Sequence, residues 1–159
     1  MIDSYDSIFE IECDAICVPT HGYIASNTEE YVMTRGLTKN MSNGFPRLEY
    51  YIRKSILEDG NLTSVIAVHE NGTSIVKFPV KPIVAPLSAQ ALAWFKVDPM
   101  ADSIPGFALV VWEEMVEASA RRLVKLADEH NWQRVAVPRM KGVSKILDDR
   151  FIMMKEGVE

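Results

Sequence analysis

The stretch that decides the fold lies near the start of the chain and reads Cys13-Asp14-Ala15-Ile16-Cys17-Val18-Pro19-Thr20-His21-Gly22. Residues 15–18 are almost all apolar, which is typical of a strand buried on both faces of a parallel sheet. His21 and Gly22 then break the apolar pattern. Ligands of α/β proteins bind at the carboxyl ends of parallel strands, so the sequence predicts a candidate site directly after this strand.

Outward from this strand, helices and strands alternate along the chain. Apolar residues at helical spacing predict helices over residues 36–43, 47–57 and 106–130. Apolar runs or period-two alternation predict further strands over residues 9–13, 64–69, 73–78 and 134–137. Asn71-Gly72 lies between two of these strands and predicts a β-hairpin. Strands that alternate with helices indicate an α/β layer fold.

The composition is that of one globular domain. The chain has 159 residues, 48% of them hydrophobic, so we expect a single domain over residues 1–159. A proline-rich insertion at about residues 79–105 is either a functional loop or an ordered surface insertion. A net charge of −5 argues against generic nucleic-acid binding. Because the chain lacks both a secretion signal and a long apolar stretch, we expect a cytoplasmic protein that makes no membrane contact.

The cysteines and histidines give no reason to expect a metal or a cofactor. Cys13 and Cys17 lie four residues apart on a predicted strand, which would place both side chains on one face, too far apart for a disulfide. We interpret them as small core residues. His21, His69 and His130 are scattered and lack the spacing of metal ligands.

The longest predicted helix, residues 106–130, combines an apolar stripe with an ordered charge pattern. The stripe consists of residues at helical spacing, namely Leu109, Trp112, Val116, Ala120, Leu123 and Ala127. Acidic residues occupy its first half and basic residues its second half, which suits the helix dipole. Glu117 and Arg121 have the spacing of an exposed ion pair. We interpret these charges as a solvated face and not as a site.

Several short motifs occur in the order in which one known family carries them. They are Val32-Met33-Thr34-Arg35-Gly36, Phe45-Pro46, Phe78-Pro79-Val80-Lys81 and Val135-Ala136-Val137-Pro138-Arg139. Together with residues 13–22, they resemble a macro domain, a module that binds ADP-ribose. The similarity is to the branch that includes terminal ADP-ribose glycohydrolases and macro-like proteins of bacteria and their viruses. It implies a three-layer α/β/α fold with a central mixed, largely parallel sheet.

The resemblance also implies contacts to the adenosine and ribose ends of the ligand. The family's adenine-binding Asp falls on Ser7 here, with Asp6 one residue away, and Ile8 keeps an apolar wall. The other interpretation of Asp6 is an ordinary carboxylate at a strand edge. The family's Asn-Gly, which holds the distal ribose hydroxyls, reads His21-Gly22, and His can donate and accept hydrogen bonds.

Two loops that resemble the family's diphosphate-binding loops have lost glycines. Where the branch reads Val-Met-Gly-Arg-Gly, this chain keeps Met33, Arg35 and Gly36 but has Thr34 in place of a glycine. In the second loop the resemblance assigns ligand contacts to Arg139, Lys141, Gly142, Val143 and Ser144. There, the family's glycines are replaced by Lys141, Val143, Lys145 and Ile146. Side chains at these positions are expected to narrow or fill the pocket, although the two lysines could replace amide contacts by charge.

Three functions remain open on the sequence. The first is a module that binds ADP-ribose, or an ADP-ribosylated macromolecule, and acts as a reader. The second is a hydrolase that removes ADP-ribose from protein or DNA, or dephosphorylates ADP-ribose 1''-phosphate. In that case Lys81 matches the family's nucleophile, although a plain surface lysine is the alternative interpretation. The third is a degenerate domain that acts through a protein partner.

Overall fold

The computed structural model describes residues 12–20, 45–60, 62–80, 113–140 and 142–157 of the 159-residue chain. The predicted helix over residues 36–43 lies outside the described residues. So do the beginning of the predicted strand at residues 9–13 and nearly all of the proline-rich segment. The elements that form the centre of the fold lie within the described ranges.

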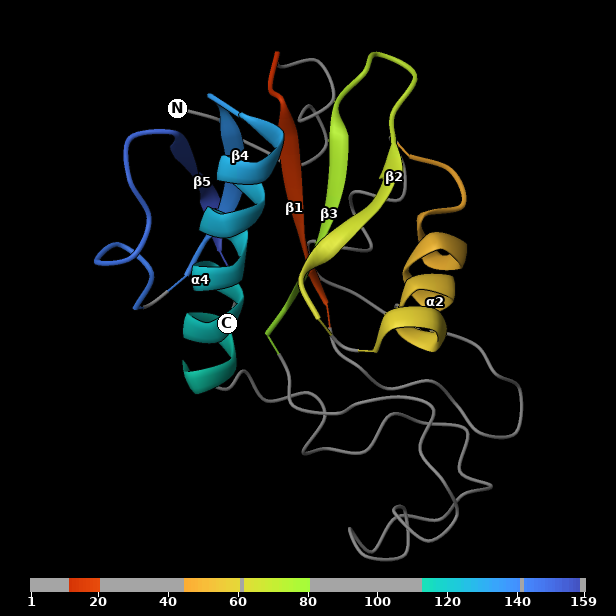
Figure 1. The fold of residues 1–159 in the computed structure, drawn as a ribbon, viewed down its shortest axis with the longest axis horizontal. Helices are drawn as coiled ribbons and strands as arrows, with labels where there is room; N and C mark the ends of the chain where they lie inside the picture. The colour runs from red at the N-terminus through yellow and green to blue at the C-terminus, as the bar shows by residue number, and fades with distance from the viewer. Residues whose placement is uncertain (1–11, 21–44, 61, 81–112, 141, 158–159) are drawn as a thin grey trace, which may run out of the picture.

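The described residues form one mixed, mostly parallel sheet, as expected. Its strands are β1 (Ala15–Thr20), β2 (Ser64–Val68), β3 (Ser74–Pro79), β4 (Val135–Arg139) and β5 (Phe151–Gly157). Their order in the sheet is β2-β3-β1-β4-β5 (Figure 1). β1 is parallel to both β3 and β4, and β5 is parallel to β4. β2 runs antiparallel to β3, which confirms the hairpin predicted from Asn71-Gly72.

Two helices pack against this sheet, and local chemistry explains where they end. Helix α2 (Leu48–Asp59) stops at Gly60, whose φ of 82° is one that glycine adopts without strain. Helix α4 (Glu113–His130) stops at Asn131, at a φ of 56°. There the amide of Trp132 donates to the carbonyl of Ala127 at 2.9 Å, as in a Schellman cap. The helices predicted over residues 47–57 and 106–130 are confirmed within the described ranges.

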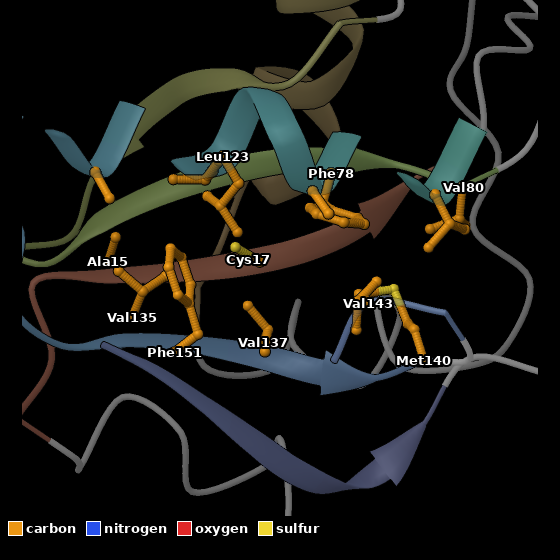
Figure 2. Packing of buried hydrophobic residues seen from close by; sticks show 14 of the residues in the cluster. Ala15, Cys17, Phe78, Val80, Leu123, Val135, Val137, Met140, Val143 and Phe151 are labelled. Carbon is orange, nitrogen blue, oxygen red and sulfur yellow. The ribbon is translucent and has the colours of Figure 1, made fainter. Parts of the chain in front are cut away.

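Each face of the sheet carries its own apolar core. The α2 face is packed by Leu48, Ile52 and Ile56 against Ile16, Val18, Ile75 and Ala136. The α4 face is larger and joins Val116, Ala120, Leu123 and Ala127 to the opposite side chains of the same strands (Figure 2). The alternation of side chains along buried strands explains this division. Among the described helices, none is long and apolar enough to span a membrane.

Two expectations about local structure were wrong. Cys13 packs on the α2 face and Cys17 on the α4 face, whereas we expected one face for both. The reason is that β1 begins only at Ala15, and a bend at Asp14 breaks the alternation. Glu12 and Cys13 accordingly lie outside any strand. Both thiols are buried and neither forms a disulfide, as expected of small core residues.

Strand β5 was not predicted from the sequence. Its start, Phe151-Ile152-Met153, is a short apolar run without clear alternation. In the structure these residues take up opposite faces, since Phe151 and Met153 pack on the α4 face and Ile152 on the α2 face. These residues form a strand because they pair with β4, and the local sequence pattern does not indicate that pairing.

Candidate functional site

The candidate site is the edge of the sheet where the parallel strands β1, β3 and β4 end. Thr20 and Pro79, the last residues of β1 and β3, are register partners. The amide of Val80 donates to the carbonyl of Thr20 at 2.9 Å, so the pairing extends one residue beyond β3. His21 and Lys81 are therefore the residues that follow two hydrogen-bonded positions. This is the edge at which α/β proteins bind their ligands.

Most of the site residues inferred from the resemblance lie outside the described residues. These are Asp6, Ser7, Ile8, His21, Gly22, Met33, Thr34, Arg35, Gly36, Lys81 and Lys141. Their roles stay predictions. The four that are described, Arg139, Gly142, Val143 and Ser144, all belong to β4 or the turn that follows it.

The turn after β4 is held by its own backbone and by one buried side chain. Gly142 has a φ of 87°, a left-handed conformation that side-chain-bearing residues rarely adopt. The carbonyl of Val143 accepts the amides of Ile146 and Leu147 at 2.9 and 3.0 Å. Arg139 and Ser144 are exposed, whereas Val143 has no exposed surface. A ligand at this turn would meet Arg139, Ser144 and backbone, but not the Val143 side chain.

The Val143 side chain belongs to the core of the α4 face. Figure 2 shows it beside Met140 at the end of β4, on the same side of the sheet as Val80. All three side chains are buried, with exposed fractions of 7% or less. Val143 is thus a packing residue that anchors the turn to the sheet.

Two acidic residues of α4 lie against this turn, which the sequence did not indicate. A Cβ atom built on Gly142 would stand 3.5 Å from Oε1 of Glu113 and 3.9 Å from Oε1 of Glu117. Glu117 forms an ion pair with Lys145 at 3.1 Å. The exposed pair expected between Glu117 and Arg121 is not among the ion pairs of the described residues. The first turn of α4 therefore adds negative charge beside the turn, partly balanced by Lys145.

Thr20 is a feature of the candidate edge that sequence reasoning missed. It is 2% exposed, and its hydroxyl has no hydrogen-bond partner among the described residues. The sequence marked residue 20 only as part of a strand end. Nothing in the residue type alone distinguishes a satisfied buried threonine from an unsatisfied one.

Lys77 is a fully buried lysine of β3, on the α2 face. Its ammonium donates to the hydroxyl of Ser55 at 2.9 Å and to the carbonyl of Gly60 at 2.7 Å. Burial lowers the pKa of Lys77 to about 8, Asp59 opposes that shift, and Arg122 adds to it. Because Gly60 closes α2, Lys77 supplies a cation at the negative end of the helix dipole.

The opposite, amino-terminal edge of the sheet contains a pocket of about 480 Å³. Its lining includes Asp14, Asn71 and Arg134. Oδ2 of Asp14 already accepts the amides of Gln133 and Arg134, at 2.7 and 3.0 Å. Oδ1 of Asn71 accepts the amide of Thr73 at 2.9 Å. These polar groups hold loops together, so the pocket is a weaker candidate than the carboxyl edge.

Metal or thiol chemistry has no support within the described ranges. No group of three or more His, Cys, Asp or Glu side chains in that part of the chain could hold a metal ion. Burial raises the pKa of Cys13, with Arg134 opposing the shift and Asp14 adding to it, and burial alone raises the pKa of Cys17. Both thiols are therefore protonated and poor nucleophiles near neutral pH.

Comparison with known proteins finds solved structures with a similar fold. No protein-family model and no curated protein matches the chain. Among solved structures, it is similar to the macrodomain of Thermus aquaticus DarG, with a TM-score of 0.56 and 14% identity over 98% of this chain and 95% of that one. It is also similar to the macrodomain of Mycobacterium tuberculosis DarG, with a TM-score of 0.53 and 15% identity over 91% of this chain and 90% of that one.

The fold is therefore that of a macrodomain, as the sequence motifs implied. The match covers nearly the whole of this chain and of the bacterial domains with which it aligns. At such low identity the similarity establishes the fold, and the activity has to be argued from the site.

Proposed function

We propose that this chain is a macro-like module that binds ADP-ribose or a related nucleotide and acts as a reader of ADP-ribosylation. The observation that carries the proposal is the macrodomain fold over nearly the whole chain. In this fold the motif-bearing segments continue from strands that end at one edge of the sheet. The pairing of Thr20 with Pro79 and Val80 supports a common site for the segments that follow β1 and β3.

The turn after β4 supports nucleotide binding, but with contacts that differ from those of a glycine-rich loop. Arg139 is exposed and can contact an anionic group, and Gly142 keeps the left-handed backbone that amide-based anion sites use. Glu113 and Glu117 place negative charge beside Gly142, and Lys145 offsets part of it. We therefore expect the diphosphate to be held mainly by Arg35 and Arg139, with fewer amide contacts than glycine-rich loops provide.

Calorimetric titration of the whole chain with ADP-ribose, with AMP as the comparison ligand, tests the proposal. Wild type should bind ADP-ribose more tightly than AMP. His21→Ala and Arg35→Ala should each weaken ADP-ribose binding by about 1–3 kcal/mol, the range for a lost buried polar contact. Lys125→Ala removes an exposed cation of α4 and is the control. Unchanged affinity in both site variants would refute this site.

A hydrolase of the same kind is the second candidate. The observation in its favour is that Lys81 and His21 each follow a residue of the hydrogen-bonded pair Val80 and Thr20. The assays are release of ADP-ribose from modified protein or DNA, and of phosphate from ADP-ribose 1''-phosphate. Turnover by wild type that Lys81→Ala abolishes would support the enzyme, and equal turnover in both would exclude Lys81 as the nucleophile.

The remaining candidate is a domain that acts through a protein partner and binds no nucleotide. The negative charge that Glu113 and Glu117 place beside Gly142 favours it, because like charge opposes the binding of a diphosphate there. No heat of binding up to millimolar ADP-ribose would favour this candidate over both nucleotide-dependent functions.

A further inference from the structure

Within the described residues, the buried polar side chains are almost all paired, which makes one exception informative. Six polar or charged residues are buried in the described part of the chain, namely Thr20, Ser55, Thr63, Thr73, Lys77 and Ser119. Five of them have partners. Ser55 and Lys77 bond each other, Thr63 donates to the carbonyl of Ser119, and Ser119 donates to the carbonyl of Pro79. A buried hydroxyl without a partner loses its hydration and gains nothing in return.

Thr20 and Thr73 form a natural comparison within one sheet. Thr73 is 4% exposed at the amino edge, directly before β3, and its hydroxyl donates to the carbonyl of Cys13 at 3.1 Å. Thr20 is 2% exposed at the carboxyl edge, at the end of β1, and the described residues offer its hydroxyl no partner. The threonine hydroxyl at the amino edge thus has a hydrogen-bond partner, whereas the one at the carboxyl edge, where the candidate site lies, has none among the described residues.

The position of Thr20 fits a ligand contact. It ends the central strand, between β3 and β4, and its own carbonyl is already taken by the amide of Val80. The carbonyl is therefore satisfied, whereas the hydroxyl has no partner among the described residues. A hydroxyl both donates and accepts, so it suits another hydroxyl, such as that of a ribose.

We propose that the Thr20 hydroxyl is a ligand-binding group of the nucleotide site, where it forms a hydrogen bond with a hydroxyl of the bound sugar. This inference rests on the proposed function and adds to it a residue that the macro-domain motifs did not indicate. It also gives a role to a buried hydroxyl that has no hydrogen-bond partner among the described residues.

Three variants of the whole chain test the inference: Thr20→Val, Thr20→Ser and Thr73→Val. Stability is measured by urea unfolding without ligand, and affinity by calorimetry with ADP-ribose. Thr20→Val should be at least as stable as wild type, because it removes an unpaired buried hydroxyl. It should bind ADP-ribose about three- to tenfold more weakly, as expected for one lost hydrogen bond. Thr20→Ser keeps the hydroxyl and should stay close to wild-type affinity.

Thr73→Val is the matched control and should show the reverse pattern. It should unfold at lower urea, because Thr73 loses its bond to the carbonyl of Cys13, and its affinity for ADP-ribose should not change. Wild-type affinity in Thr20→Val would overturn the inference, and so would a loss of stability like that of Thr73→Val. If wild type itself binds no ADP-ribose, the proposed function fails and this inference fails with it, whereas equal ADP-ribose affinity of wild type and Thr20→Val refutes the inference alone.

Discussion

The two faces of the sheet are buried by different kinds of side chain. On the α4 face the core is apolar and extends beyond the sheet, because Met140 and Val143 carry it into the turn after β4. On the α2 face the core is smaller and lies next to a buried cation, Lys77, held by Ser55 and Gly60. The same five strands supply both faces through the alternation of their side chains.

This difference indicates that the two faces depend on different interactions. The turn after β4 accommodates the Val143 side chain because that side chain packs into the apolar core of the α4 face. The α2 face instead depends on hydrogen bonds from one lysine to groups at the end of α2. The stability of the α4 face should therefore depend mainly on apolar packing, and that of the α2 face on the protonation state of Lys77.

The largest effect is expected from Val143→Gly, which restores a glycine to the turn. Deleting this fully buried side chain should lower the free energy of unfolding by about 2–4 kcal/mol, through lost burial and the cavity that remains. Ser144→Gly changes the exposed neighbouring residue and should cost less than about 1 kcal/mol. Urea unfolding of both variants measures the difference, and equal losses would contradict the placement of Val143 in the core.

Lys77→Met should change how stability depends on pH. The pKa of Lys77 falls from 10.5 to about 8 on folding, so between these values the unfolded chain binds the proton more tightly. Wild-type stability should therefore rise with pH across this window, by up to about 3 kcal/mol. The variant should lack that rise.

Unfolding in urea at several pH values from 7 to about 10.5 tests the expectation for Lys77. Lys125→Met removes an exposed lysine of α4 and should keep the wild-type rise. Titration of other groups affects all three proteins alike, so the difference between the two variants isolates Lys77. A rise of the same size in Lys77→Met would show that the buried lysine does not control the α2 face.

The smallest effect is expected from Lys145→Ala, which breaks the ion pair with Glu117 at the rim of the α4 face. The Lys145 side chain is 65% exposed, so its removal should lower stability by less than about 1 kcal/mol. High salt should abolish even this difference, because exposed charges are screened. A loss as large as that of Val143→Gly, measured by the same unfolding assay, would mean that the ion pair and not the apolar side chain holds the turn.

Local patterns predicted most of the elements in the described part of the chain. The apolar run at residues 15–18 predicted β1, and Asn71-Gly72 predicted the hairpin of β2 and β3, because both signals depend on neighbours in sequence. Strand β5 escaped detection, because its order comes from pairing with β4. The two cysteines lie on opposite faces because a bend at Asp14 interrupts the alternation of side chains, and the sequence pattern does not reveal that bend.

The candidate site was less accessible to sequence reasoning. Motif order indicated the edge of the sheet and the turn after β4, and it implied that side chains would replace glycines there. It did not indicate that Val143 would turn into the core or that Glu117 would pair with Lys145, since those contacts join residues far apart in sequence. It also gave no sign that the hydroxyl of Thr20 would lack a partner.

The sequence by itself determined the α/β class, the hairpin, the central strand and the macro-domain order of motifs, because each of these follows from spacing and turn chemistry within short stretches. Only the tertiary structure decided which polar groups are buried and which of them are paired. Lys77 is an ordinary strand lysine in the sequence and a buried cation in the fold, because Ser55 and Gly60 reach it from another element. Pairing of buried groups depends on distances that no local pattern contains.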